Sequence, residues 1–294
     1  MKMLSSSTCP SDGAPPAVGP AHVPTLRVDG RVDVRVDVRA GRNVVTRTTE
    51  RGGYRLRFPR RGAVPEGILI NTGGGVCDGD RLNLTCTVSA GAALDMTSQA
   101  AERAYRRAGP DPARIDVAMS VGGGAGLRWL PQETILFDRA GLKRRFQVDL
   151  AQDATFTACE VVVFGREAMG EHVRDGAISD QWRIRRDGQL VFADALRFDG
   201  DVKAALAEAA VAAGARVTAL IMHVSEDAPD QVDRLRALLA TQAPADPQFQ
   251  YGVSGWRGLL VVRATGARSR PVRDFAAHAV ETLTARPVPR VWQS

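Results

Sequence analysis

The stretch RVDVRVDVRA, residues 31–40, alternates valine with arginine or aspartate over its first nine positions. A period of two places all the valines on one face of a β-strand and all the charged residues on the other. The stretch therefore predicts a strand that is buried on one side and meets water on the other.

Shorter apolar runs of similar character follow, and Gly, Asp, Asn and Pro stand between most of them, as turns require. They lie at residues 67–70, 82–88, 115–121, 145–150, 158–164, 181–185 and 189–192. Many short strands at this spacing favour a large antiparallel sheet system, either a sandwich or a coiled stack.

The apolar pattern after Asp199 takes on the period of helices. We expect one helix with Asp199 as its N-cap and Gly214 past its end, a second over residues 230–241, and a third that has Pro271 in its first turn. Strands at 216–224 and 258–264 alternate with them. We therefore expect a disordered tail at 1–24 and a single domain at 25–294, with a β-rich body at 25–199 and an α+β portion at 200–294.

The composition, 44% apolar and 24% charged, excludes a wholly disordered chain. No stretch approaches the roughly 18 uncharged apolar residues that cross a bilayer. The first 24 residues lack the apolar core of a signal peptide, so we expect a cytoplasmic protein. Four cysteines are too few for a disulfide scaffold in a chain of this size, and without a CxxC pair or closely spaced histidines there is no sequence-local zinc site.

The net charge of +6 is concentrated in residues 27–61, which hold eleven arginines and four carboxylates. Such a basic segment can attract an acidic partner or a nucleic acid. It can equally be a pair of solvated strand faces, and both interpretations stay open.

The segment NTGGGVCDGD, residues 71–80, is unusually rich in glycine. It is not a P-loop, because Asp80 stands where that motif requires lysine, nor a calcium loop, because Leu82 replaces an oxygen ligand. Two interpretations remain. Cys77, Asp78 and Asp80 hold a borderline metal such as nickel transiently, or Asp80 caps the turn and Cys77 is an inert small side chain.

Two further segments carry carboxylates in unusual settings. In WLPQETILF, residues 129–137, Glu133 stands in an apolar run, where a carboxylate must find a partner or lose its charge. Around FGREAMGEH, residues 164–172, the clustered side chains can perform acid–base chemistry or bind a cation; they are Glu160, Glu167, Glu171 and His172. Alternatively, Arg166 pairs with a carboxylate and fixes a turn. No Ser–His–Asp order or GxSxG elbow supports a hydrolase.

Together these motifs resemble the urease accessory protein D family, also called UreD or UreH. The resemblance covers roughly residues 30–292 and rests on segments 71–82, 97–105, 129–137, 165–171 and the ending PRVW at 289–292. The positions that match the family motifs are Asn71, Gly74, Gly75, Gly79, Asp80, Gln99, Tyr105, Pro131, Glu133, Gly165, Arg166, Gly170 and Glu171. The chain departs from the family loop at Thr72, Gly73, Cys77 and Asp78, so Cys77 and Asp78 are poor candidates for a family-wide role.

The resemblance implies a non-enzymatic chaperone that binds urease apoprotein and, through accessory protein F, the GTPase accessory protein G. That assembly helps nickel reach the urease active site, and the GTPase hydrolyses the GTP. The resemblance implies no tightly bound cofactor, and we expect neither a nucleic-acid nor a membrane partner. It also implies a mainly β fold of stacked, helix-like mixed sheets, with a few helices mostly in the C-terminal third.

The family resemblance further implies an internal polar passage for Ni²⁺. Hydrated Ni²⁺ is attracted by negative charge and exchanges oxygen ligands easily. We predict that its carboxylates are Glu66, Asp80, Glu133, Glu160, Glu167 and Glu171. Two other hypotheses remain: a metal-dependent enzyme that uses the Glu/His cluster (Glu133, Glu167, Glu171 and His172), and a basic RNA-binding β-protein that uses residues 27–61.

Overall fold

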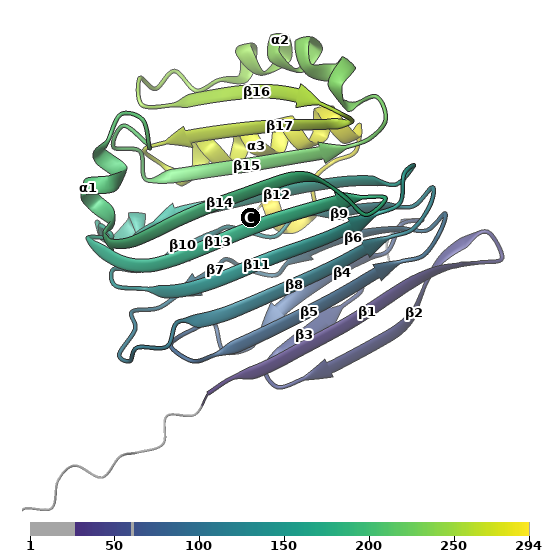
Figure 1. Cartoon of the computed structure of the whole chain (residues 1–294), viewed down its shortest axis with the longest axis horizontal. Helices are drawn as coiled ribbons and strands as arrows, with labels where there is room; N and C mark the ends of the chain where they lie inside the picture. Colours follow the sequence, from purple (N-terminus) through teal and green to yellow (C-terminus); the bar gives the residue numbers. More distant parts are fainter. Residues whose placement is uncertain (1–26, 60–61, 294) are drawn as a thin grey trace, which may run out of the picture.

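The computed structural model describes residues 27–59 and 62–293, and strands dominate them (Figure 1). The tail predicted for residues 1–24 lies outside the described residues. Two sheets stack face to face, and helices cover the outer side of one of them.

The seven-stranded sheet has the order β14-β13-β11-β8-β5-β1-β2. Its strands are β1 (Asp29–Arg39), β2 (Arg42–Arg51), β5 (Arg81–Val88), β8 (Ala113–Val121), β11 (Gly141–Leu150), β13 (Asp175–Arg186) and β14 (Gln189–Asp201). The predicted strand at residues 31–40 is β1, and Val32, Val34 and Val36 are buried as expected. Val38 differs and is 42% exposed, because it lies at the end of the strand beside the turn to β2.

The ten-stranded sheet has the main order β16-β17-β15-β12-β9-β6-β4-β3, and β10 and β7 extend it beside β12. Its strands are β3 (Tyr54–Arg57), β4 (Glu66–Asn71), β6 (Ala93–Ser98), β7 (Glu102–Ala104), β9 (Gly126–Trp129), β10 (Thr134–Leu136), β12 (Thr155–Phe164), β15 (Val217–Val224), β16 (Gln250–Trp256) and β17 (Leu259–Gly266).

The chain crosses repeatedly from one sheet to the other, so that each sheet grows by parallel strands. In the seven-stranded sheet β1, β5, β8, β11 and β13 are parallel neighbours, and Val34, Cys86 and Met119 stand opposite one another in successive strands. The stacked, helix-like arrangement is therefore confirmed. Antiparallel pairing, which the strand pattern favoured, occurs toward the ends of the sheets, for example between β1 and β2 and between β13 and β14.

The first hydrophobic core fills the space between the two sheets. Phe146 on β11 stacks on Trp182 of β13 with ring centroids 3.9 Å apart, and Trp129 of the opposite sheet meets Phe146 edge to face. Each aromatic side chain buries a large apolar area, so this layer contributes strongly to stability.

The second core lies between the ten-stranded sheet and two helices, α2 (Val232–Gln242) and α3 (Ser269–Thr284). The predicted third helix is α3, with Pro271 in its first turn, and the residues that it turns toward the sheet are buried: Val272, Phe275, Ala276, Ala279 and Leu283. Within the described residues, no helix is long and apolar enough to span a membrane.

The first predicted helix is much shorter than its pattern suggests. The helix α1 covers only Val202–Ala207, and its N-cap is Asp201, whose carboxylate accepts a hydrogen bond from the Ala204 amide. The expectation that Asp199 is the cap is wrong, because β14 continues pairing with β13 as far as Asp201. The strand ladder therefore determines where the helix begins.

Candidate functional site

The glycine-rich loop, residues 71–80, leaves the end of β4 and is held by its first residue. The Asn71 side-chain amide donates hydrogen bonds to the Gly75 carbonyl and to a Glu102 carboxylate oxygen, each 3.0 Å long. Gly75 lies against Tyr105, and an added Cβ would stand 2.6 Å from the carbonyl oxygen of Arg103. At position 75, therefore, only glycine fits without displacing its neighbours.

The acidic end of this loop is structural. Asp80 is 2% exposed, and its carboxylate accepts hydrogen bonds from the backbone amides of Val28 (2.8 Å) and Cys77 (2.9 Å). Asp78 in the same way accepts from the amide of Ala108 at 2.8 Å. Burial and the neighbouring Asp80 raise the pKa of the Cys77 thiol, which keeps the sulfur protonated. The capping interpretation of Asp80 is therefore confirmed.

A chain of ring contacts joins the loop to the other motif segments. The Tyr105 hydroxyl donates to the Gly74 carbonyl at 3.0 Å, and its ring meets Phe137 edge to face at 4.9 Å. The Arg166 guanidinium lies 4.6 Å above the Phe137 ring and pairs with Glu171, with Nε and Oε2 2.9 Å apart. Four motif segments that are separated in the sequence are thus joined in the fold.

The pairing of Arg166 with a carboxylate was one of the open interpretations, and it is confirmed. Hydrogen bonds from Arg166 lower the pKa of Glu171 and keep its carboxylate charged. Gly165 has a φ of +89°, and a Cβ there would collide with the Glu171 carbonyl. Gly170, with a φ of +63°, ends the short 3₁₀ turn Glu167–Met169. These glycines shape a tight turn around the ion pair.

Three of these motif segments, 97–105, 129–137 and 165–171, line an open pocket of about 670 Å³, which we call the edge pocket. Its floor is apolar, its rim holds charges of both signs, and Met169 beside it is 71% exposed. It is lined by Arg103, Tyr105, Glu133, Ile135, Phe137, Val163, Gly165, Arg166, Glu167, Ala168, Met169 and Ser269. A hollow with an apolar centre and a charged rim is typical of a surface that receives another protein.

Two of the predicted carboxylates lie in the edge pocket. Glu133 pairs with Arg273 of α3, with Oε2 and Nε 3.3 Å apart, and each side chain is 15% exposed. Glu167 accepts a hydrogen bond of 2.9 Å from the Ser269 amide at the start of α3. Both side chains tie the pocket to that helix.

Behind the edge pocket, a polar cluster is buried between the two sheets; we call it the interior network. Arg144 on β11 pairs with Glu160 of β12 at 2.8 Å and with Asp180 of β13. Arg144 also donates to the Thr134 hydroxyl at 2.8 Å, and the Trp129 indole donates to Glu160 at 2.7 Å. Thr134 directly follows Glu133, so the network begins next to the pocket.

The interior carboxylates hold their protons unusually tightly. Burial raises the pKa of Glu160 to about 7, although Arg144 opposes the change. Burial likewise raises the pKa of Glu102 to about 7, against the hydrogen bond from Asn71. The charge of both carboxyl groups therefore changes near neutral pH.

The six predicted carboxylates are not all in one place. Glu133 and Glu167 line the edge pocket, Glu171 lies at its rim, and Glu160 belongs to the interior network. Asp80 caps the loop turn, and Glu66 stands at the start of β4, opposite Asp95 of β6. Across residues 27–59 and 62–293, no three His, Cys, Asp or Glu side chains gather closely enough to hold a metal ion.

Sequence reasoning missed three members of this arrangement: Glu102, Arg144 and Asp180. A signal was present for two of them, because Arg144 and Asp180 occupy inward positions of strands whose other inward residues are apolar. Glu102 lies in the motif at 97–105, but only the fold shows that it is half-buried on β7 beside Asn71.

Of the other matched positions, Gln99 is exposed, and its backbone amide donates to the Leu69 carbonyl.

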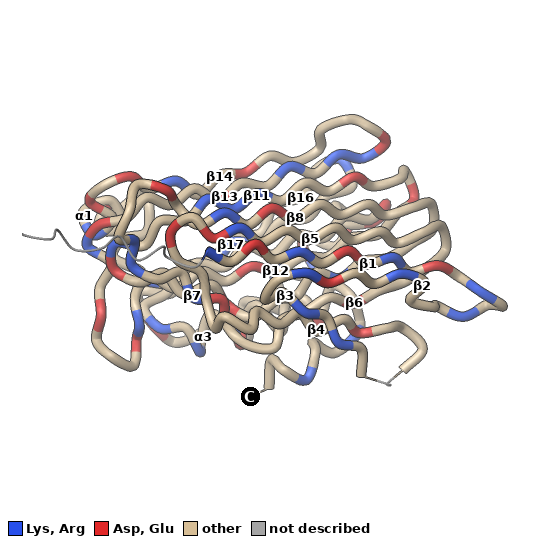
Figure 2. Tube along the Cα trace, turned by 90° about the horizontal axis from the view of Figure 1, so that it is seen from below, with Lys and Arg blue, Asp and Glu red and all other residues tan. Residues whose placement is uncertain are grey.

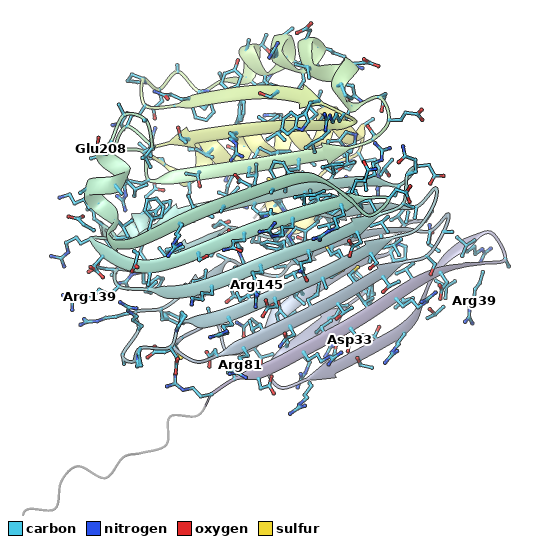
Figure 3. The ribbon with its side chains drawn as sticks, in the orientation of Figure 1. Asp33, Arg39, Arg81, Arg139, Arg145 and Glu208 are labelled. Carbon is cyan, nitrogen blue, oxygen red and sulfur yellow. The ribbon has the colours of Figure 1, made fainter. Side chains whose placement is uncertain are left out.

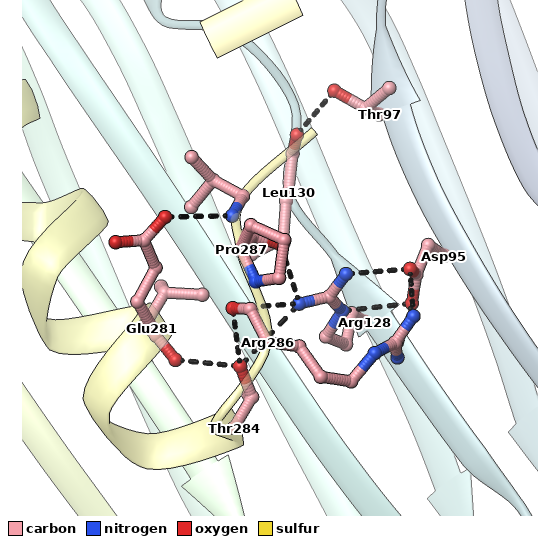
Figure 4. A network of polar contacts seen from close by, with 10 residues as sticks. Asp95, Thr97, Arg128, Leu130, Glu281, Thr284, Arg286 and Pro287 are labelled. Atoms are coloured by element: carbon pink, nitrogen blue, oxygen red, sulfur yellow. Dashed lines mark hydrogen bonds and ion pairs between the residues drawn. The ribbon is translucent and has the colours of Figure 1, made fainter. Parts of the chain in front are cut away.

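The C-terminal motif PRVW closes over the outer face of the ten-stranded sheet. Figure 4 shows Asp95 between Arg128 and Arg286, and Arg128 also donates to the Pro287 carbonyl at 3.0 Å. The Trp292 indole donates to the Leu130 carbonyl at 2.9 Å. The chain end is thereby fixed to residues 128–132, next to Pro131 and Glu133.

The geometry agrees with a comparison to known proteins. The chain matches the UreD urease accessory protein family over residues 28–293. It belongs to that family. A UreD urease accessory protein of Methylobacterium sp. (strain 4-46) is 45% identical over 86% of this chain and 90% of its own length. Those of Azorhizobium caulinodans and Xanthobacter autotrophicus are 42% and 40% identical, over 90% and 98% of this chain and 96% and 98% of their own lengths. The predicted family membership is therefore confirmed, and the chain is a urease accessory protein of the UreD family.

Proposed function

We propose that the chain is a chaperone that binds urease apoprotein and, through accessory protein F, the GTPase accessory protein G. Within that assembly it helps nickel reach the urease active site, in the cytoplasm and without catalysing a reaction itself. Membership of the UreD family supports this proposal. The observation that carries it is the convergence of the motif segments on the edge pocket, with the interior network directly behind it.

The edge pocket suits a protein partner. Its floor of Ile135, Phe137 and Val163 can bury an apolar side chain of the partner, and Met169 supplies a flexible, polarisable contact. Arg166 is held in place by Phe137 and Glu171, so its guanidinium is already oriented when a partner arrives. A rigid, charged rim around an apolar centre favours specific over non-specific binding.

In this proposal nickel is transferred to urease, and carboxylates of the edge pocket and of the interior network bind it transiently on the way. Glu133 and Glu167 at the pocket offer oxygen ligands near the surface, and Glu160 and Asp180 offer them between the sheets. Each already has a partner, such as Arg144 for Glu160 or Arg273 for Glu133. Nickel must displace that partner, so each site binds the ion only briefly, as a conduit requires.

The partner-binding part of the proposal is tested by co-purification of the chain with urease apoprotein and accessory protein F from cells. Met169→Asp places a charge on the edge pocket and should lower recovery of at least one partner about tenfold. Leu238→Asp on α2, where Leu238 is 42% exposed, is the matched control and should retain both partners. Full recovery with Met169→Asp would show that the pocket is not the interface.

The conduit part is tested separately by the nickel content of urease matured with a Glu160→Gln chain. Glutamine keeps the shape of the side chain but removes the exchangeable charge, so nickel loading should fall while both partners still co-purify. Glu208→Gln, at the exposed end of α1, is the control and should leave loading unchanged. Unchanged loading with Glu160→Gln would exclude this residue from the path.

A further inference from the structure

A row of cations crosses the outer face of the seven-stranded sheet. The parallel register places Arg81 opposite Arg114, Arg114 opposite Lys143, and Lys143 opposite Ser179, which in turn faces Arg197 on β14. All four cations are exposed. Neighbouring strands are about 4.8 Å apart, so the row is about 19 Å long. Figure 3 shows Arg81 at one end of this face and Arg145, from the next row, near its middle.

These cations lack the ion pairs that their neighbours make. Arg145 pairs with Asp116 at 2.9 Å, and Arg31 and Arg35 on β1 pair with Asp33 and Asp37. Among the described residues, none of Arg81, Arg114, Lys143 and Arg197 forms an ion pair with a carboxylate. Asp29, which stands opposite Arg81, pairs with Arg51 instead. Figure 2 shows how basic and acidic residues alternate elsewhere on these strands.

Like charges opposite one another in a sheet repel, so this row destabilises the free protein. An anionic partner that lies along the row would remove the repulsion and gain attraction from each cation. The row therefore favours binding of an acidic partner.

Three of the four cations also lie in a groove. A hollow of about 520 Å³ covers Arg114, Lys143 and Arg197, and Arg107 adds a further cation without an ion pair in the described structure. One wall is made by Pro110 and Pro112 before β8, and the opposite end by Phe198 and Asp199 of β14. The cations therefore line a concave basic surface and not a flat charged face.

We propose that this basic groove binds an acidic segment of a protein partner. Its location on the outer face of the seven-stranded sheet separates it from the edge pocket, which is built on the ten-stranded sheet. The chain thus has two binding surfaces, one largely apolar in its centre and one electrostatic.

A protein segment fits better than a nucleic acid. Single-stranded nucleic acids bind on exposed aromatic side chains, and the aromatic residue of the groove, Phe198, is 7% exposed. Asp116 and Asp199 also line the groove. A nucleic acid carries a phosphate at every nucleotide and is repelled by these carboxylates, whereas a peptide can place neutral residues beside them, and its backbone amides can donate hydrogen bonds to them.

The test measures binding of the full chain to a fluorescent peptide of about 12 residues that alternates glutamate with serine, long enough to span the row. Fluorescence anisotropy should show binding that weakens as salt is raised. Arg114→Glu with Lys143→Glu should weaken it at least about tenfold. Arg42→Glu with Arg47→Glu on β2 changes the net charge equally on exposed residues outside the groove and should change affinity less than about twofold.

Two results would overturn the proposal. Absence of peptide binding, or equal weakening by both double variants, would show that the groove is not a site and that only net charge acts. A single-stranded oligonucleotide of about 12 nucleotides is tested in parallel. Tighter binding of that oligonucleotide, abolished by the groove variant, would assign the groove to nucleic acid. Neither result depends on urease maturation, so the proposed function is tested independently.

Discussion

Arg144 on β11 reaches across the core to Glu160 on β12, and their Nη1 and Oε2 atoms are 2.8 Å apart. The two side chains are 6% and 3% exposed, so the pair joins the two sheets in a region that excludes most water. A second carboxylate, Asp180, contacts the same guanidinium. One guanidinium therefore contacts two buried carboxyl groups that come from different strands.

Loss of this cation should be costly. Arg144→Met leaves Glu160 and Asp180 buried without their partner, and we expect it to lower the free energy of unfolding by about 3–5 kcal/mol. The neighbouring Arg145→Met is the control, because Arg145 is 60% exposed and its pair with Asp116 should contribute less than about 1 kcal/mol. Urea unfolding monitored by tryptophan fluorescence measures the free energy of unfolding of both variants. Small and equal losses of that free energy would mean that the interior network does not hold the sheets together.

The raised pKa of Glu102 predicts a pH dependence of stability. Its pKa is raised from 4.5 to about 7 in the folded protein. The folded state therefore binds this proton more tightly, and the associated stability, up to about 3 kcal/mol, is fully present below pH 4.5 and lost as the pH rises through 7.

Glu102→Gln removes this titration and should flatten the fall in stability between pH 4.5 and 7. Glu208→Gln, exposed on α1, should leave the slope as it is in the unmodified protein. The free energy of unfolding is measured by urea titration at several pH values. An unchanged slope in Glu102→Gln would show that Glu102 does not titrate in this range.

The close contact at Gly75 predicts a sharp difference between two adjacent glycines. Gly75→Ala drives a methyl group against Tyr105 and the Arg103 carbonyl, so we expect a loss of about 1–3 kcal/mol and a displaced tyrosine. Gly74 has a φ of +72° and open space around it. Gly74→Asn should therefore cost less than about 1 kcal/mol. Thermal unfolding and near-ultraviolet circular dichroism compare the two, and similar losses would argue against the close packing.

The contact of Asp95 with two arginines predicts that this residue holds the C-terminal segment. In Asp95→Asn, Arg128 and Arg286 repel each other, and the chain end should detach from the sheet. Hydrogen exchange at the amides of Val288 and Trp292 should then be faster. Asp274→Asn on α3 breaks only an exposed pair with Arg270 and should leave this exchange unchanged. Slow exchange in both variants would show that other contacts hold the segment.

The local pattern of the sequence was a good guide to single elements. The alternation at residues 31–40 correctly predicted β1 and its buried face, and the helical period after Asp199 correctly predicted a last helix with Pro271 in its first turn, which is α3. The strand direction did not follow, since an alternating strand reads the same way in parallel and antiparallel ladders. The helix after Asp199 was misplaced because strand pairing with β13 extends β14 through the expected cap.

The site was only partly predictable for a similar reason. The motif residues Tyr105, Arg166 and Glu171 were identified, and the pairing of Arg166 was among the interpretations. Their joint surface depends on β7, β10 and β12 lying side by side, which no local pattern specifies. The partners of the inward-facing Arg144 come from two other strands, so only the fold could reveal them.

The central claim is that this chain supports nickel loading of urease, and the nickel content of urease tests it most directly. Urease is purified from cells that hold a complete accessory set with and without this chain, and nickel is counted per active site by mass spectrometry. We predict near-empty sites without the chain and full recovery when it is restored. Equal nickel content with and without it would contradict the claim.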